Sequence, residues 1–139
     1  MNAALEFAYT VIFVEDVLQT VEFYEKAFDL QRALVTPNFA QMQTGTVTLA
    51  FGANANERYE LPADFSFREN HPDQEPGGFQ ISFVCQDVAA AFKQAINAGA
   101  IPVVPPRTMP WGQTVSRVRD CNGVLVSLVS RFQPSPMQA

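Results

Sequence analysis

The sequence predicts an α+β fold made of two tandem βαβββ modules, which form a curved mixed sheet around a central cavity. The first observation is an internal repeat, in which Tyr9–Val17 (YTVIFVEDV) matches Gln80–Val88 (QISFVCQDV). In each copy an apolar, strand-like run ends at an Asp-Val pair and continues into a helical pattern. The second observation is that the copies begin about half a chain length apart, which indicates a duplicated half-domain and not a short-period array. Two modules that each expose an apolar sheet face are expected to pack around a shared concavity.

Length and composition fit one globular domain. The chain has 139 residues, of which 47% are hydrophobic and 12% aromatic, and a chain of this size can bury a core. We expect a single domain over residues 1–139. Module one is expected at about 5–52, a linker at about 53–78 and module two at about 79–131.

The charge and the hydropathy pattern exclude several classes of partner. The formal net charge is −5, so no basic surface indicates binding to nucleic acid or to an anionic membrane. No apolar run approaches the roughly 18 residues of a spanning helix, and the first residues lack the pattern of a signal peptide. A cytoplasmic protein is expected.

The first module has the pattern of a strand, a helix and three strands. Residues Phe7–Val14 are rich in β-branched and aromatic residues and predict a strand. Asp16 can cap the following helix, whose apolar positions fall at i, i+4, i+7 and i+11: Val17, Val21, Tyr24 and Phe28. Three strands are predicted next: Gln31–Thr36, Phe39–Thr44 and Thr46–Phe51. The last one alternates, which places Thr48 and Ala50 on one face and Leu49 on the other.

The linker, Gly52–Gly78, has no periodicity and carries four large apolar side chains: Tyr59, Leu61, Phe65 and Phe67. A loop of this length in a compact domain is typical of a functional or mobile segment. Two interpretations stay open. Either these side chains form a flap over the cavity, or they pin the linker to the core.

The second module repeats the plan. Strand Phe79–Cys85 leads into a helix capped by Asp87 and stopped at Asn97–Gly99. A Pro-rich stretch, Pro105–Gly112, is predicted to be a stiff loop, and Asp120–Gly123 a tight turn. The remaining strands are predicted at Ile101–Val104, Val115–Arg119 and Val124–Val129, and the Pro-rich tail Gln133–Ala139 is expected to fray.

Together these segments resemble the vicinal oxygen chelate superfamily, which holds glyoxalases, extradiol dioxygenases, fosfomycin-resistance enzymes and bleomycin-resistance proteins. The resemblance covers about Phe7–Val129. It rests on the strand-Asp-Val run of both copies and on Val21–Leu30, Ala98–Pro102, Trp111-Gly112 and Asp120–Gly123. It implies the fold described above. It also implies a homodimer, because many single-chain, two-module members pair and often build pockets between subunits.

In metal-dependent members, as the resemblance implies, four inward-facing side chains bind a divalent cation, one on the first and last strand of each module. They are usually His or Gln at the starts and Glu on the closing strands. In this chain the starts fall on Tyr9 and Gln80, and the closing positions on Ser127 and Ala50, or on Leu49 if the register is shifted by one. Alanine and leucine offer no donor to an ion of the Zn, Ni, Mn or Fe type. We therefore expect no metal and no cofactor.

Other side chains with metal or nucleophile chemistry have ordinary explanations. His71, the only histidine, lies in the polar linker and is expected to be a solvated loop residue. Cys85 and Cys121 do not form a Cys-x-x-Cys spacing and are expected to be free thiols.

Without an ion, the concave face is expected to be an apolar cup with a few hydroxyls and one amide, which suits a flat or amphipathic organic molecule. Eight residues are expected to bind it: Tyr9, Phe13, Thr48, Gln80, Ser82, Trp111, Arg117 and Ser127. Trp111 either stacks on the ligand as a lid or packs against the prolines of its own loop. Arg117 and Arg119 share a face, where one of them clamps an anionic substrate or both are solvated edge-strand arginines.

The leading hypothesis is a metal-free, small-molecule-binding protein of the bleomycin-resistance type, which sequesters an aromatic or amphipathic compound. The alternative is a glyoxalase-like lyase or isomerase, or a dioxygenase, that uses a divalent metal with Gln80 as a surviving ligand. Whether any reaction is catalysed stays open at this point.

Overall fold

The computed structural model of the chain describes residues 3–54 and 61–132, and in these stretches it has two helices and eight strands. The predicted α+β fold with two βαβββ modules is confirmed. The first module contains β1 (Thr10–Val14), α1 (Val17–Phe28), β2 (Gln31–Val35), β3 (Phe39–Thr44) and β4 (Val47–Ala53). The second contains β5 (Gln80–Val84), α2 (Val88–Asn97), β6 (Ile101–Thr108), β7 (Thr114–Arg119) and β8 (Leu125–Val129). The tail 133–139 lies outside the described residues.

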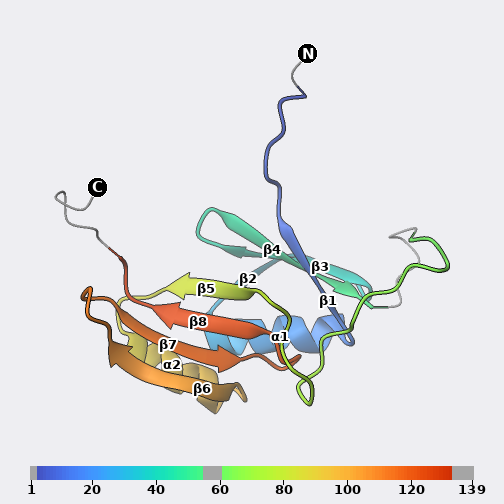
Figure 1. Cartoon of the computed structure of the whole chain (residues 1–139). Coiled ribbons are helices and arrows are strands. Elements are labelled where there is room, and N and C mark those ends of the chain that lie inside the picture. The colour runs from blue at the N-terminus through green and yellow to red at the C-terminus, as the bar shows by residue number, and fades with distance from the viewer. Residues whose placement is uncertain (1–2, 55–60, 133–139) are drawn as a thin grey trace. The chain divides into compact units, whose positions relative to one another are not determined.

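Each module forms its own four-stranded mixed sheet (Figure 1), with the order β1-β4-β3-β2 in one and β5-β8-β7-β6 in the other. The first and last strands of each module are parallel neighbours, and the other pairs are antiparallel. The chain divides into two compact units. The first holds β1 to β4 with most of α1, and the second holds β5 to β8, α2 and Lys26–Phe28.

Both helices begin at the aspartates that the repeat predicts. The Asp16 carboxylate accepts a hydrogen bond from the backbone N–H of Gln19, and that of Asp87 from the N–H of Ala90, each at 3.0 Å. Both caps have an extended backbone, as an N-cap requires. The repeated Asp therefore starts the helix at the same point in both modules.

The core of the first unit lies between α1 and one face of its sheet. Val17, Val21 and Tyr24 of α1 are buried, and the Tyr24 ring lies 4.8 Å from the ring of Phe51 on β4. Leu49 shares that face of β4 because it is two residues from Phe51. Ala50 therefore points to the opposite, open face.

The second unit is built in the same way. Helix α2 packs on β6, β7 and β8, and the strand residues on the helix side are buried: Ser116, Val118, Val126 and Leu128. Strand alternation then places Arg117 and Ser127 on the open face of this sheet. No helix in the described stretches is both long enough and apolar enough to cross a membrane.

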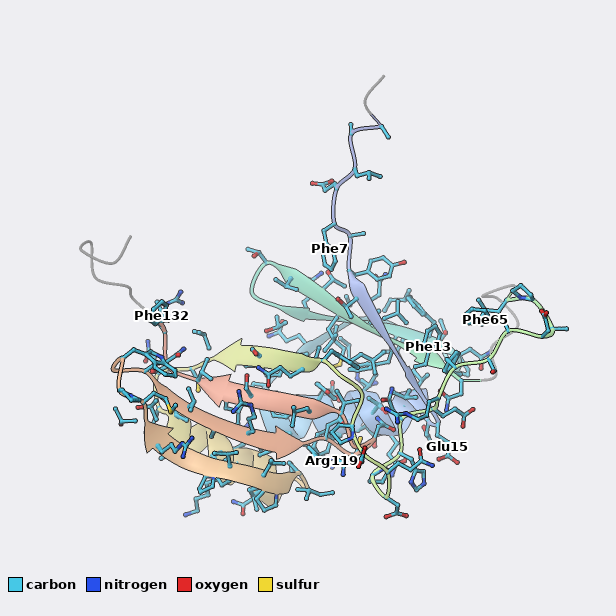
Figure 2. The ribbon with its side chains drawn as sticks, viewed as in Figure 1. Phe7, Phe13, Glu15, Phe65, Arg119 and Phe132 are labelled. Carbon is cyan, nitrogen blue, oxygen red and sulfur yellow. The ribbon has the colours of Figure 1, made fainter. Side chains whose placement is uncertain are left out.

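Two strand boundaries differ from the predicted ones by three or more residues. Strand β1 begins at Thr10 and not at Phe7, and Phe7 is 80% exposed on the segment before it (Figure 2). Strand β6 continues to Thr108, through prolines that were predicted to be a loop. It is an edge strand, where a missing N–H costs no ladder bond on the open side. Because β6 occupies the edge, β7 is an inner strand, and the interpretation of its arginines as edge-strand residues is wrong.

Side-chain contacts attach the linker within each unit. Phe67 stacks on Phe13 of β1, with ring centroids 4.8 Å apart and an interplanar angle of 28°. This contact pins the linker to the open face of the first sheet, whereas Phe65 is 55% exposed (Figure 2). Tyr59 lies outside the described residues.

The second attachment is made by Arg119 (Figure 2). Its guanidinium donates to the backbone carbonyl of Gly123 at 2.9 Å and of Pro72 at 3.1 Å, and also to the carbonyls of His71 and Gln74. The Arg119 guanidinium therefore holds residues 71–74 against the β7–β8 turn. Its donors are used on these carbonyls and not on a ligand.

Glycine is required at position 123 of that turn. Its φ is +85°, and a Cβ there would lie 2.6 Å from the carbonyl oxygen of His71 and 2.5 Å from an Arg119 nitrogen. Gly112 has a similar φ of +94° but has nothing within 4 Å of the added atom. The two glycines thus share a backbone conformation and differ in the space around them.

We expect Gly123→Ala to lower the free energy of unfolding by about 2 to 3 kcal/mol, because a clash with backbone is added to the cost of a positive φ. Gly112→Ala serves as the control and should cost only about 1 kcal/mol, the backbone term alone. Urea denaturation of both variants measures the difference. Equal losses would contradict the close approach of residues 71–74 to the turn.

Candidate functional site

A row of hydrogen-bonded polar side chains crosses the open face of the second sheet. It consists of Gln80 and Ser82 on β5, Ser127 on β8 and Arg117 on β7, and we call it the polar cluster. Arg117 Nε donates to Gln80 Oε1 at 3.0 Å, and Gln80 Nε2 donates to Ser82 Oγ at 3.3 Å. Ser127 Oγ donates to the same Ser82 Oγ at 2.6 Å. Four of the eight predicted ligand-binding residues are therefore in mutual contact.

Strand register brings these residues together. Ser82 is directly opposite Ser127 in the parallel β5–β8 pair, and Ser127 is opposite Arg117 in the antiparallel β8–β7 pair. Opposite residues in neighbouring strands share a face. The Gln-x-Ser spacing on β5 adds Gln80 to this face, since side chains two residues apart point the same way.

The cluster is partly shielded from water by the strands around it. Ser127 is only 3% exposed, Arg117 is half-buried, and Gln80 and Ser82 are exposed. Alternation places four apolar residues on the same face: Val84, Val115, Leu125 and Val129. The surface thus combines a polar centre with aliphatic flanks.

The other predicted binding residues belong to the first unit or to a loop. Tyr9 directly precedes β1 and meets the Phe39 ring edge-on at a centroid distance of 6.4 Å. Thr48 is half-buried on β4, and Phe13 is covered by Phe67. All three belong to the first unit.

Trp111 lies in the short loop between β6 and β7 and is 54% exposed. Its indole N–H donates to Gln113 Oε1 at 3.0 Å, and the Gln113 amide donates to the Ser130 carbonyl at 3.0 Å. The loop is thereby tied to the end of β8. Trp111 remains exposed enough to report on a bound compound by its fluorescence.

The register also identifies the first-module counterpart of Ser127. Ala50 is opposite Val11 in the parallel β1–β4 pair, as Ser127 is opposite Ser82 in β5–β8. Val11 and Ser82 are equivalent in the repeat. The closing-strand position of the first module, which carries a metal ligand in metal-dependent members, therefore falls on Ala50. Leu49 lies on the helix side of the sheet and does not occupy this position.

The side chains at the four family positions do not fit a divalent cation. Ala50 has no donor atom, and the Gln80 carbonyl oxygen already accepts a bond from a cationic guanidinium. Ser127 donates to Ser82, and Tyr9 is an aromatic neighbour of Phe39. In the described stretches no group of three His, Cys, Asp or Glu side chains is placed to hold a metal. Zn, Ni and Fe are bound mainly by imidazole, carboxylate or thiolate groups, and a single amide oxygen among these four side chains does not supply such a set.

One hollow was not indicated by the sequence. It has a volume of about 480 Å³ and lies on the second unit, where its lining consists of Lys26, Ala90, Lys93, Gln94, Asn97 and Ala98. These residues come mainly from α2 and have no repeat, motif or spacing that would signal a site. It is an open surface depression and is separate from the polar cluster on the opposite side of the sheet.

Cys85 shows no sign of nucleophilic activation. Burial, together with the nearby Asp87 charge, raises the pKa of the Cys85 thiol. The Cys85 thiol also lies 3.7 Å from the Val129 carbonyl oxygen. A raised pKa leaves less thiolate at neutral pH, and the thiolate is the reactive form.

We expect alkylation of Cys85 by iodoacetamide to reach half of its maximal rate at a pH above about 8.5, the ordinary cysteine pKa, because its pKa is raised. Asp87→Asn removes the charge, which is the smaller of the two causes, but keeps a capping oxygen, so the rate at pH 8 should rise. Peptide mass spectrometry measures the rate, with Asp64→Asn as the control. An unchanged rate in Asp87→Asn would show that Asp87 does not influence the thiol.

Comparison with known families gives a match over nearly the whole chain. The model of the Glyoxalase/Bleomycin resistance protein/Dioxygenase superfamily matches residues 6–128. The resemblance inferred from the sequence motifs is thereby confirmed. None of the curated proteins matches this chain.

Solved structures share the fold at low sequence identity. A glyoxalase/bleomycin resistance protein/dioxygenase family enzyme from Burkholderia phytofirmans PsJN has a TM-score of 0.78 and 20% identity, covering 92% of this chain and 100% of that one. A glyoxalase-related enzyme from Fulvimarina pelagi has a TM-score of 0.76 and 17% identity, covering 91% and 88%. TioX from Micromonospora sp. ML1 has a TM-score of 0.68 and 21% identity, covering 92% and 100%. At these identities the likeness shows the fold alone.

Proposed function

This chain belongs to the Glyoxalase/Bleomycin resistance protein/Dioxygenase superfamily, and we propose that it is a metal-free, small-molecule-binding protein of the bleomycin-resistance type. In this proposal it sequesters an aromatic or amphipathic compound, and the polar cluster is the polar centre of the binding surface. The observation that carries the proposal is the bond from Arg117 Nε to Gln80 Oε1. This bond occupies the side-chain oxygen of Gln80, the one residue at the four family positions that matches a usual metal ligand of the family.

The flanking residues supply the apolar part of the surface. Val84 is half exposed at 52%, and Val115, Leu125 and Val129 are partly exposed beside the cluster. Covering apolar surface with a flat compound contributes about 25 cal/mol per Å². A few fixed polar groups among apolar residues then orient the compound, as is typical of small-molecule sites.

The cluster is ordered before any ligand arrives. Ser82 is held from two sides by Ser127 and Gln80, and Gln80 is held by Arg117. Side chains that are already immobilised lose little conformational entropy when a compound binds. This order supports binding and requires no reacting group. A lyase or dioxygenase would need carboxylate or imidazole ligands that the family positions of this chain do not supply.

We expect Ser127→Ala to weaken binding of a flat aromatic probe, 2-naphthamide, about fivefold, because Ser82 loses the bond that positions it. Titration followed by Trp111 fluorescence or by NMR measures the affinity. Binding should be unchanged by EDTA and by prior incubation with Zn, Mn or Fe(II). Stoichiometric metal retention, or loss of binding on chelation, would contradict the proposal.

Ser116→Ala is the matched control. Ser116 is also a buried β-strand serine, and its hydroxyl donates to the Leu128 carbonyl at 2.9 Å, but it lies on the helix side of the sheet. Both variants should lose about 1 kcal/mol of unfolding free energy. Only Ser127→Ala should lose affinity, so equal binding losses would place the site elsewhere.

We also propose that the protein is cytoplasmic, and that it forms a homodimer as the family resemblance implies. Light scattering after size exclusion should give a molar mass about twice that of one chain. A mass equal to one chain across a concentration series would contradict the dimer.

A further inference from the structure

The polar cluster has more hydrogen-bond donors than acceptors available to a ligand. A serine hydroxyl has one donor and two acceptor lone pairs. Ser82 Oγ accepts from both Gln80 Nε2 and Ser127 Oγ, so the group that it has left to offer is its own O–H. The side-chain amide of Gln80 is similar. Its oxygen accepts a hydrogen bond from Arg117, and its NH₂ group donates one of its two N–H groups to Ser82, so the other N–H is left for a ligand.

Arg117 adds a positive charge that no carboxylate neutralises within the described stretches. The ion pairs found there are Arg32 with Glu25 and His71 with Asp73. Arg117 donates its Nε–H to Gln80, and its two terminal nitrogens carry further N–H donors. Arg119, two residues along the same strand, instead uses its guanidinium on backbone carbonyls.

We infer that the polar cluster binds a carboxylate group of the ligand, with the terminal nitrogens of Arg117 and the hydroxyl of Ser82 as its donors. This inference deepens the proposed function and depends on it, since it specifies which class of aromatic compound the surface takes. The planar guanidinium matches a planar carboxylate in shape and donor spacing. The aliphatic neighbours reduce the contact of this pair with water, and that strengthens a charge-assisted hydrogen bond.

The bond between Arg117 and Gln80 also orients the guanidinium. Because its Nε–H is directed to Gln80 Oε1 at 3.0 Å, the plane of the group is constrained along the β5 side of the sheet. A preorganised donor pair loses less entropy on binding than a mobile surface arginine. Gln80, at a family ligand position, here serves to position an arginine and not to hold an ion.

The test compares 2-naphthoate with 2-naphthamide, which share the ring system and differ in the charge of the polar group. We expect the carboxylate to bind the full chain at least about tenfold more tightly. In Arg117→Gln the two affinities should become nearly equal. Arg117→Lys should keep part of the preference, because lysine keeps the charge but not the planar fork.

Lys93→Gln is the charge control. Lys93 is an exposed lysine of α2, on the other side of the same sheet, and its loss removes one positive charge without touching the cluster. This variant should keep the preference for 2-naphthoate. The NMR signal of the Arg117 Nε–H should also shift with 2-naphthoate and much less with 2-naphthamide. Denaturation curves confirm that each variant is folded.

The possible results distinguish the carboxylate inference from the proposed function. Equal affinities for the two probes in the unchanged chain would overturn the carboxylate inference and leave the proposed function standing. A preference that Lys93→Gln abolishes as fully as Arg117→Gln would overturn the assignment to Arg117, because net charge would then explain it. Failure of both probes to bind at millimolar concentration would overturn the proposed function and this inference with it.

Discussion

The parallel pairing of the first and last strand in each module is the constraint on which the site depends. In the second module it sets Ser82 opposite Ser127, and the antiparallel β7 then sets Arg117 opposite Ser127. A shift of one residue in any of these pairs would turn the cluster toward α2, where unpaired polar groups are costly. The burial of Val118, Val126 and Leu128 against the helix therefore holds the polar residues on the open face.

The same constraint shows how the two modules diverged in chemistry while keeping one plan. The positions equivalent to Ser82 and Ser127 are Val11 and Ala50, which can form no hydrogen bond through their side chains. The first sheet thus offers apolar contact where the second offers donors.

Much of the fold could be predicted because its signals are local. The Asp16 and Asp87 caps, the alternation of β4 and the Gln-x-Ser spacing on β5 all depend on neighbours in sequence. The extent of β6 could not be predicted in this way, since its prolines are tolerated only because that strand lies at the sheet edge. The role of Arg119 depends on carbonyls nearly fifty residues earlier in the chain, which no local pattern reveals.

The two arginines of β7 show why residue type and face do not suffice to assign a role. Arg117 and Arg119 lie on the same face of the same strand, and the predicted binding set contained Arg117 although alternation alone gives both arginines the same face. The structure distinguishes them by their partners, because carbonyls of the linker and the turn surround Arg119, whereas Arg117 meets one amide oxygen. A guanidinium satisfied by fixed backbone groups would have to break those bonds before it could bind a ligand, and the linker would be released with them. The charge available for recognition is therefore that of Arg117. Arg119 instead stabilises the linker segment that borders the β7–β8 turn.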